Sequence, residues 1–247
     1  MQSTIISNEN IIWIHSSSLG EFEQGRPLIE RIKKQQPQYK ILLTFFSPSG
    51  FEIRKNYAYA DYIFYLPNDT PKQVKAFFDI VQQRIIFFIK YDYWFNYIRQ
   101  AHLRNIPFYV VSCIFRPQQI YFQCYGKWFL KQIQQITHFF TQDKLSLELL
   151  YKNGISQASI CGDTRFDRVA DMIKGSKEIN SISQFCNQQQ TIVCGSTWKP
   201  DEYILSQLCR QTNYKFIIAP HEIEESRIQE VESLFSETTI IRYSQIE

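Results

Sequence analysis

The sequence predicts an α/β fold in which a mostly parallel sheet carries helices on both faces. Short apolar runs alternate with amphipathic stretches along the first 170 residues. Such runs are typical of buried strands, and the stretches between them repeat their apolar residues at helical spacing. A regular alternation of strand and helix is the pattern of a parallel sheet that helices cover on both sides.

Each expected strand is an apolar run, and each expected helix occupies the stretch before the next run. In order, the strands are expected near residues 11–15, 40–46, 61–66, 84–89, 107–112, 138–141 and 159–161. The helices are expected near residues 20–35, 48–57, 71–82, 93–104, 125–135 and 145–153. Together these elements predict a Rossmann-like domain over residues 1–173.

A second, smaller region follows a polar stretch with poor periodicity that begins at Lys174. We interpret residues 174–190 as a linker and residues 191–247 as a partial domain. Strands are expected at residues 191–195, 214–219 and 239–243. One helix is expected to open at Pro200, a residue suited to the first helical turn, and another to cover residues 222–236. Three strands and two helices make about half of a Rossmann-like domain.

The composition indicates a folded protein without a structural metal site. Of the 247 residues, 44% are hydrophobic and 16% are aromatic, which is ample for a core. Six cysteines stand singly with no Cys-x-x-Cys pair, and four scattered histidines add no ligand spacing. The first ten residues lack the apolar core of a signal peptide, and no apolar stretch approaches about 20 residues. We therefore expect a cytoplasmic protein.

The charge is divided unevenly along the chain. Residues 1–170 hold 20 Lys and Arg against 13 Asp and Glu, whereas residues 171–247 hold 7 against 11. A basic surface on the first region would attract a phosphorylated lipid or an anionic membrane leaflet. An ordinary solvated surface is the alternative, because charges spread over 170 residues need not cluster.

One carboxylate lies where the first strand turns into the first helix. Glu21 comes shortly after the apolar run at residues 11–14 and opens a helical pattern. In open parallel sheets, ligands bind beyond the carboxyl ends of the strands, close to the amino termini of helices. Glu21 is therefore a candidate functional residue. The alternative is an acid that only complements the helix dipole.

Five motifs in order and spacing resemble those of the Kdo transferases, which act in lipopolysaccharide synthesis. They are His15-Ser-Ser-Ser-Leu-Gly-Glu21, Thr44-Phe-Phe-Ser-Pro-Ser-Gly50, Lys90-Tyr-Asp-Tyr-Trp-Phe-Asn96, Phe115-Arg-Pro-Gln-Gln119 and Gly162-Asp-Thr-Arg-Phe-Asp-Arg168. The resemblance runs from about Ile11 to the last residue. Several motifs in register are more specific than any one of them.

The resemblance implies a GT-B fold and the transfer of 3-deoxy-D-manno-octulosonic acid (Kdo) from CMP-Kdo to a lipid A precursor, lipid IVA. It implies that Glu21 is the general base, and it implies no cofactor, no metal and no nucleic-acid partner. The resemblance also implies that the protein acts at the inner face of the inner membrane. Family members usually carry an amino-terminal anchor and a longer second domain, so we expect a fragment, peripheral attachment, or a partner that completes the chain. By itself this chain is expected to transfer Kdo poorly.

The resemblance and the residues around Glu21 suggest acceptor contacts. Ser17, Ser18 and the backbone of Gly20 are expected to orient the acceptor, and glycine lets a ligand approach the backbone closely. For the serines the alternative is helix capping, because Ser18 and Glu21 have the spacing of a capping box.

Three more residues are candidate acceptor contacts. Asp92 and Asn96 are four residues apart and would share one face of a helix, with a cap by Asp92 as the alternative. The family commonly has Glu where this chain has Asp92. Arg116 is suited to a phosphate or carboxylate, or else is a surface arginine without a partner.

In the second region the resemblance assigns donor binding to Ser196, Thr197 and His221. Ser196 and Thr197 stand at an expected helix start suited to phosphate, and His221 follows an expected strand. A cap by Thr197 and a surface histidine are the alternatives. Two other functions remain open. One is an inactive remnant that binds lipid A precursor or a partner subunit, and the other is a GT-B transferase that uses a nucleoside diphosphate sugar.

Overall fold

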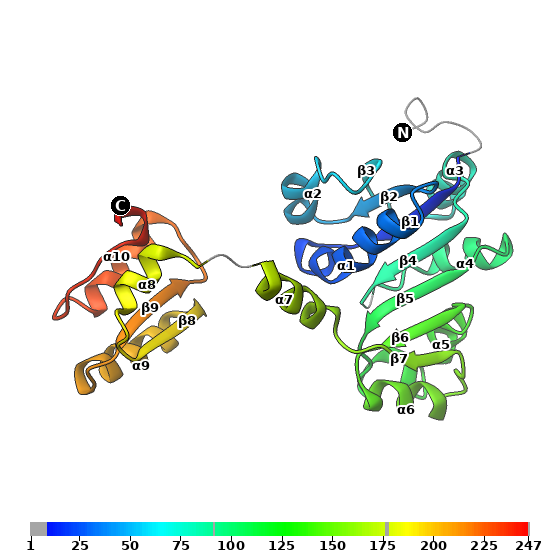
Figure 1. Cartoon of the computed structure of the whole chain (residues 1–247). Coiled ribbons are helices and arrows are strands. Elements are labelled where there is room, and N and C mark those ends of the chain that lie inside the picture. The colour runs from blue at the N-terminus through cyan, green and yellow to red at the C-terminus, as the bar shows by residue number, and fades with distance from the viewer. Residues whose placement is uncertain (1–8, 91, 176–177, 247) are drawn as a thin grey trace. The chain divides into compact units, whose positions relative to one another are not determined.

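The computed structural model describes residues 9–90, 92–175 and 178–246. The chain forms two compact units, unit 1 (Met1–Lys174) and unit 2 (Gly175–Glu247), which Figure 1 shows in blue to green and in yellow to red. The division falls one residue from the domain end expected at 173. Each unit is described by itself.

Unit 1 is built on a seven-stranded parallel sheet with the order β3-β2-β1-β4-β5-β6-β7. Its strands are β1 (Ile11–His15), β2 (Lys40–Phe45), β3 (Tyr62–Tyr65), β4 (Ile85–Ile89), β5 (Phe108–Cys113), β6 (His138–Thr141) and β7 (Ala158–Ile160). The seven strands expected in this region are confirmed, each within one residue at both ends.

Helices cover both faces of the sheet, as expected. They are α1 (Leu19–Gln35), α2 (Pro48–Arg54), α3 (Pro71–Val81), α4 (Phe95–Leu103), α5 (Lys127–Ile133), α6 (Lys144–Lys152) and α7 (Thr164–Gly175), with a 3-10 turn η1 (Ile120–Phe122) before α5. Helix α7 was not expected, because the helices predicted from the sequence in this region end with residues 145–153. Thr164 anchors the start of α7 by donating to the Gln24 carbonyl at 2.7 Å.

The pleat of β1 separates the core into two clusters. Ile11 and Trp13 face the cluster that α3, α4, α5 and α6 complete, whereas Ile12 and Ile14 face the cluster under α1 and α2. Trp13 has no exposed surface, and its ring centroid lies 4.7 Å from that of Phe77. Alternate side chains of a strand point to opposite faces, so one strand contributes to both clusters.

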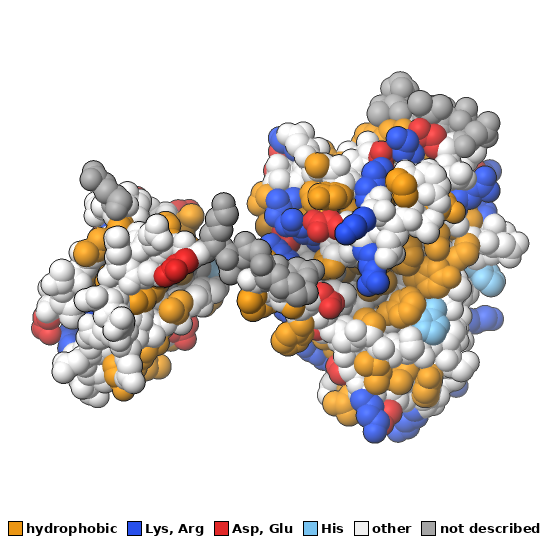
Figure 2. All heavy atoms as spheres, in the orientation of Figure 1, with side chains coloured by type: hydrophobic (Ala, Val, Ile, Leu, Met, Phe, Trp, Pro, Cys, Tyr) orange, Lys and Arg blue, Asp and Glu red, His pale blue; other side chains and the backbone are white. Residues whose placement is uncertain are grey.

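Aromatic side chains also line a partly exposed stretch of the sheet. Tyr109 of β5 stacks on Phe87 of β4, with ring centroids 5.3 Å apart, and also contacts Phe140 of β6 at 6.2 Å. These three side chains are half-buried. Figure 2 shows hydrophobic side chains gathered on the face of unit 1 over these strands.

Unit 2 contains one parallel pair of strands and three helices among its described residues. The strands are β8 (Thr191–Thr197) and β9 (Lys215–Pro220), and the helices are α8 (Asn180–Cys186), α9 (Lys199–Gln211) and α10 (Glu225–Leu234), followed by a 3-10 turn η2 (Tyr243–Gln245). Pro200 lies in the first turn of α9, as expected.

Two expectations for this region differ from the structure. The strand expected at 239–243 is wrong, because residues 239–242 form no regular element and the turn η2 begins at Tyr243. Arg242 instead bonds Glu225 and Glu232. Within the segment expected to be a linker, 174–190, residues 180–186 form α8. This helix packs on β9, where the Lys215 ammonium lies 5.2 Å from the Phe185 ring centroid.

Among the residues that the structure describes, no helix is both long and apolar enough to cross a bilayer.

Candidate active site

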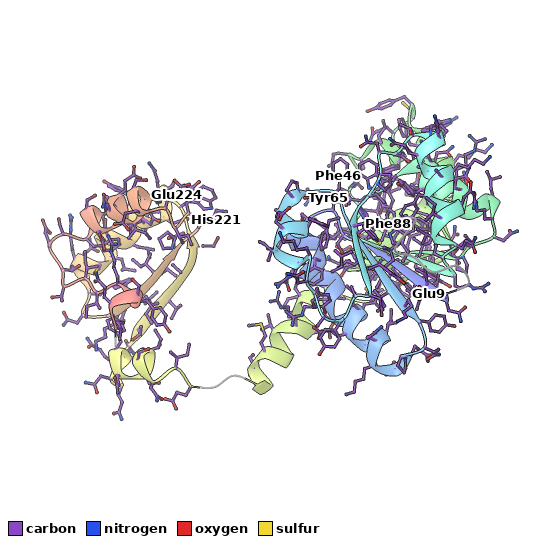
Figure 3. The ribbon with its side chains drawn as sticks, turned by 90° about the horizontal axis from the view of Figure 1, so that it is seen from above. Glu9, Phe46, Tyr65, Phe88, His221 and Glu224 are labelled. Atoms are coloured by element: carbon purple, nitrogen blue, oxygen red, sulfur yellow. The ribbon has the colours of Figure 1, made fainter. Side chains whose placement is uncertain are left out.

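The carboxyl ends of the seven parallel strands meet at one edge of the sheet of unit 1. The order in which strands are added reverses between β1 and β4, since β2 and β3 lie on one side of β1 and β4 to β7 lie on the other. Open α/β sheets bind their ligands beyond such a switch point. The segments after β1 and β4 therefore border the expected site. Phe46 and Tyr65 mark this edge in Figure 3, and Glu9 marks the opposite one.

Glu21 lies in the first turn of α1, immediately beyond this switch point. Ser18 is the N-cap residue of α1, but its hydroxyl makes no bond to the backbone and instead donates to the Glu21 carboxylate. The capping-box alternative for Ser18 is therefore wrong. Lys90 follows β4, and its ammonium lies 3.7 Å from Glu21 Oε1. The Glu21 side chain is 13% exposed, so its carboxylate is accessible but largely enclosed.

Asp92 is a second carboxylate at the same place. Burial raises the pKa of Asp92, and the nearby negative charge of Glu21 raises it further. A hydrogen bond with the Ser17 hydroxyl and the positive charge of Lys90 act in the opposite direction. One lysine thus faces two carboxylates across the switch point. Paired carboxylates with different surroundings are a frequent arrangement in acid and base catalysis.

Behind these carboxylates lies a buried polar series. The Trp13 indole donates to Thr44 Oγ1 at 2.8 Å, and His15 Nδ1 lies 2.9 Å from the same oxygen. His15 Nε2 lies 3.2 Å from Ser17 Oγ. Burial lowers the pKa of His15 to about 3, so its imidazole is neutral. Its ring also packs on Phe88 of β4, which Figure 3 labels, with centroids 4.7 Å apart.

The structure brings four of the other six predicted residues of unit 1 close to Glu21 or onto its helix turn. Ser17, Ser18 and Asp92 contact the carboxylate cluster as described above. Gly20 is exposed in the same turn, and an added Cβ there would meet only Ser18 Oγ, at 3.7 Å. Packing therefore does not explain this glycine, and the surface beside Glu21 is open at that point.

Asn96 and Arg116 have other surroundings. Helix α4 begins at Phe95, so Asp92 precedes the helix, and the expectations that it caps α4 or shares a helical face with Asn96 are wrong. The Asn96 amide donates to the Asp69 carbonyl at 2.8 Å, which ties α4 to the loop before α3. Arg116 is exposed and lines a surface hollow beside α6.

In unit 2, Ser196 and His221 meet at the carboxyl ends of β8 and β9. Ser196 has a positive φ of 58°, and its hydroxyl lies 2.8 Å from His221 Nδ1. The Trp198 ring stacks on His221 at 4.5 Å between centroids. Figure 3 labels His221 and Glu224 in this region of unit 2. These exposed groups could receive an anionic ligand at the start of α9.

Thr197 points the other way. Its side chain is buried, and its hydroxyl donates to Glu202 Oε1 at 2.9 Å. The N-cap of α9 is Trp198, so the alternative that Thr197 caps this helix is wrong. The hydroxyl is engaged inside the unit.

Sequence reasoning missed the roles of His15, Thr44 and Lys90. His15 is the last residue of β1, and Lys90 follows β4, so both stand at the carboxyl ends of apolar strands beside the switch point. This position in the sequence could have identified them as candidates. Thr44 was recognised only as the start of a motif, since pairing of β1 with β2 had to be known before its contact with His15 could be derived. Among the described residues, no group of three or more His, Cys, Asp and Glu side chains is placed to hold a metal ion.

Solved structures with a similar fold include UDP-GlcNAc 2-epimerase from Neisseria meningitidis, with 14% identity and a TM-score of 0.64 over 93% of this chain and 70% of that one. MurG from Acinetobacter baumannii is similar at 8% identity, with a TM-score of 0.56 over 93% of this chain and 63% of that one. At these identities the likeness concerns the fold alone. It supports an α/β fold of the GT-B type.

Curated relatives are similar in sequence. A 3-deoxy-D-manno-octulosonic acid transferase from Haemophilus influenzae is 32% identical over 41% of this chain and 24% of its own length. A bifunctional glycosyltransferase/methyltransferase from Fusobacterium nucleatum is 25% identical over 98% of the chain and 39% of its own length. A 3-deoxy-D-manno-octulosonic acid transferase from Rickettsia felis is 25% identical over 84% and 45%. The chain thus spans less than half the length of each of these relatives.

A family model covers the whole of the site in unit 1. The model for 3-deoxy-D-manno-octulosonic-acid transferase (kdotransferase) matches residues 2–168, which include the switch point, both carboxylates and the start of α7. This match extends over more than half of the 247 residues, and the five motifs lie within it. The chain therefore belongs to the 3-deoxy-D-manno-octulosonic-acid transferase (Kdo transferase) family.

Proposed function

We propose that this chain is a glycosyltransferase of lipopolysaccharide synthesis that transfers Kdo from CMP-Kdo to the lipid A precursor lipid IVA. The observation that carries the proposal is the position of Glu21, a partly enclosed carboxylate in the first turn of α1 at the switch point of the sheet. Membership of the Kdo transferase family supports the choice of sugar and acceptor.

Glu21 acts as the general base in the proposed reaction. An acceptor hydroxyl attacks the anomeric carbon of Kdo, and a new carbon–oxygen bond forms there. The bond from that carbon to the CMP phosphate oxygen breaks, and CMP leaves with the electron pair. The proton of the attacking hydroxyl passes to Glu21, which must lie within hydrogen-bond reach of it.

Other residues bind the two substrates in this proposal. Ser17, Ser18 and the open backbone at Gly20 contact the acceptor in this proposal, because they lie in the segment that leads to Glu21 and the Ser18 hydroxyl donates to its carboxylate. In unit 2, Ser196 and His221 offer hydrogen bonds to the anionic donor near the amino terminus of α9.

Replacement of the base tests the proposal directly. Glu21→Gln keeps the size of the side chain but removes the proton acceptor, so we expect transfer to fall by about 10²–10⁴-fold. Glu52→Gln is the matched control, because Glu52 is an exposed acid on α2 that pairs with the neighbouring Lys55. The assay mixes the chain, CMP-Kdo and lipid IVA and follows the product by mass.

The same assay separates the proposal from its alternatives. Transfer by Glu21→Gln at the wild-type rate would show that Glu21 only complements the helix dipole. Binding of lipid IVA without any transfer by the wild-type chain would favour the inactive remnant. Transfer from a nucleoside diphosphate sugar, but not from CMP-Kdo, would favour a different GT-B transferase.

We propose further that unit 1 attaches peripherally to the cytoplasmic face of the bacterial inner membrane. A surface hollow of about 370 Å³ between α4 and α5 is lined by Arg99, Trp128 and Lys131, among others. Trp128 is 57% exposed, and the nearby Leu103 is 60% exposed. An aromatic ring beside basic side chains suits the headgroup region, with cations placed near lipid phosphates. The excess of basic residues in residues 1–170 adds to this attraction.

Vesicle sedimentation tests the attachment. We expect binding to vesicles with anionic lipids that weakens as salt rises, because screening shortens the electrostatic reach to about 8 Å at physiological ionic strength. Trp128→Ala should weaken binding, whereas Ile53→Ala, at an exposed position of α2, should not. Equal binding to neutral and anionic vesicles would contradict the proposal.

A further inference from the structure

Lys90 has a backbone conformation that its surroundings must impose. Its φ angle is 68°, in the left-handed region that is unfavourable for residues with a Cβ atom. The backbone N–H of Lys90 donates to the Val111 carbonyl at 2.8 Å, so the adjacent strand β5 holds this residue in place. Non-glycine residues with strained backbones persist only where the surrounding structure fixes them, and they cluster at functional sites.

The residues with this conformation fall into two groups. Among the described residues, seven non-glycine residues have a positive φ. Four of them follow the ends of helices, where a left-handed residue is a common way to end a helix: Gln82, Asn105, Asn187 and Gln188. The other three lie at or beside the carboxyl ends of strands: Lys90, Ser112 and Ser196. The end of a helix therefore does not explain the strain at Lys90, which lies at the edge expected to bind ligands.

The Lys90 ammonium lies beside the proposed general base. It is 3.7 Å from Glu21 Oε1, and the two side chains are 18% and 13% exposed. This distance exceeds hydrogen-bond length, so the contact is a pair of charges that can open without the loss of a hydrogen bond between them. The other oxygen, Glu21 Oε2, accepts from the Ser18 hydroxyl. A cation is thus held next to the base at a place that remains accessible.

The proposed reaction brings a further carboxylate to this place. Kdo is an ulosonic acid, so its carboxylate is bonded to the anomeric carbon itself. Glu21 must lie within about 3 Å of the attacking hydroxyl oxygen, and that oxygen within about 3–3.5 Å of the anomeric carbon. The sugar carboxylate therefore comes within about 8 Å of the Glu21 oxygens, where the two negative charges repel each other. A site for this sugar needs a cation there, and Lys90 is placed to supply it.

We propose that Lys90 is a specificity-determining residue whose ammonium binds the carboxylate of the Kdo sugar, an inference that rests on the proposed function. Before the step, the ammonium is shared between that carboxylate and Glu21. Glu21 becomes neutral when it takes the proton of the attacking hydroxyl, so the ammonium is then left to the sugar carboxylate. Their attraction grows during the step, and interactions that are stronger in the transition state raise the rate.

A donor without the negative charge tests this pairing in the transfer assay. The methyl ester of CMP-Kdo at the sugar carboxyl group differs from CMP-Kdo in that this group is uncharged. We expect the wild-type chain to prefer the acid by about 10- to 100-fold in kcat/KM, Lys90→Arg to keep most of this preference, and Lys90→Met to lose it. Lys144→Met is the matched control, because it removes the charge of an exposed lysine on α6. A full preference for the acid in Lys90→Met would overturn the proposal.

Lys90→Gly is a second variant for the case in which Lys90→Met does not fold. Glycine adopts a positive φ without strain, so this variant should unfold at the same or a higher urea concentration than the wild type and still lose the preference for the acid. Gln82→Gly changes a residue of the same backbone conformation at the end of α3 and should keep the preference. If Lys90→Gly also keeps it, Lys90 does not bind the sugar carboxylate.

Binding tests the pairing without turnover. In nuclear magnetic resonance titrations, the amide signals of Glu21 and Lys90 report the Kd of the methyl glycoside of Kdo and of its methyl ester. We expect the wild-type chain to bind the acid about tenfold more tightly than the ester and Lys90→Met to bind both equally. Equal Kd values in the wild type would contradict the inference. If the wild-type chain transfers no Kdo, the proposed function fails, and these titrations alone decide whether Lys90 recognises the sugar carboxylate.

Discussion

At the residue scale, the most unusual feature is a fully buried histidine beneath a charged site. His15 has no exposed surface, and burial lowers its pKa to about 3. The imidazole is tolerated because Thr44 and Ser17 satisfy both of its nitrogens. A buried polar group whose partners are present costs little, whereas one that loses a partner costs about 1–3 kcal/mol.

This pKa makes the stability of unit 1 depend on pH. The ordinary His pKa is 6.5, and the folded value is about 3. Between these values the unfolded chain binds a proton that the folded chain does not, so the contribution of His15 is complete above 6.5 and is lost as pH falls toward 3. The free energy of unfolding should drop by about 1.4 kcal/mol per pH unit within this window.

Urea unfolding from about pH 7 to about pH 4 measures this dependence. Carboxylates titrate in the same range, so the informative quantity is the difference between the wild type and His15→Gln, which should narrow as pH falls. His102→Gln, at an exposed position of α4, is the control. A constant difference between the wild type and His15→Gln would mean that His15 is protonated in the folded chain.

At the scale of elements, a buried ion pair joins α9 to α10 in unit 2. Glu202 of α9 is fully buried, and it accepts from Thr197 and pairs with Arg227 of α10. Removing one partner of a buried ion pair leaves the other charge without compensation, which costs more than the pair contributes. The two helices should therefore separate readily when this pair is broken.

The substitution Arg227→Met tests the role of this ion pair between α9 and α10. We expect faster hydrogen exchange in α9 and α10 and a lower midpoint of thermal unfolding for unit 2, because the buried Glu202 side chain loses its partner. Arg210→Met is the matched control, since Arg210 pairs with the exposed Glu237 at 3.1 Å and loses only a surface pair. Equal exchange in the two variants would show that Glu202 gains access to water.

At the scale of the whole molecule, the two units differ in how much core they contain. Every residue of the two hydrophobic clusters belongs to unit 1. In the described part of unit 2, the buried apolar residues are Val231 and Phe235. Val193 of β8 is 71% exposed and Ile223 is 80% exposed. Small units with so little buried apolar surface are marginally stable.

The stability of separate fragments tests this difference. We expect residues 1–174 alone to unfold cooperatively and to keep the near-ultraviolet signal of the buried Trp13. Residues 175–247 alone should unfold without cooperativity, because hydrophobic burial is the main favourable term in folding. Circular dichroism of both fragments during heating provides the measurement. A sharp transition in 175–247 would contradict the expectation.

The sequence by itself determined the strands of unit 1 and the identity of Glu21 as the leading candidate. Apolar runs such as residues 11–15 and 85–89 consist mostly of residue types that are usually buried, so the ends of these strands were predicted within one residue. Glu21 was recognisable because the position of a residue after a strand and at a helix start is a local property. Periodicity also indicated that the sheet is parallel and covered on both faces.

Only the tertiary structure decided which side chains surround Glu21. Strand order placed β4 beside β1, which brought Lys90 and Asp92 to Glu21 across about 70 residues of sequence. It also bonded Asn96 to Asp69, placed Arg116 at a surface hollow beside α6 and directed Thr197 into the interior of unit 2. The run 239–243 has a strand-like sequence but forms no strand. Contacts between residues that are distant in sequence depend on which strands pair and on where helices begin, and local periodicity predicts neither.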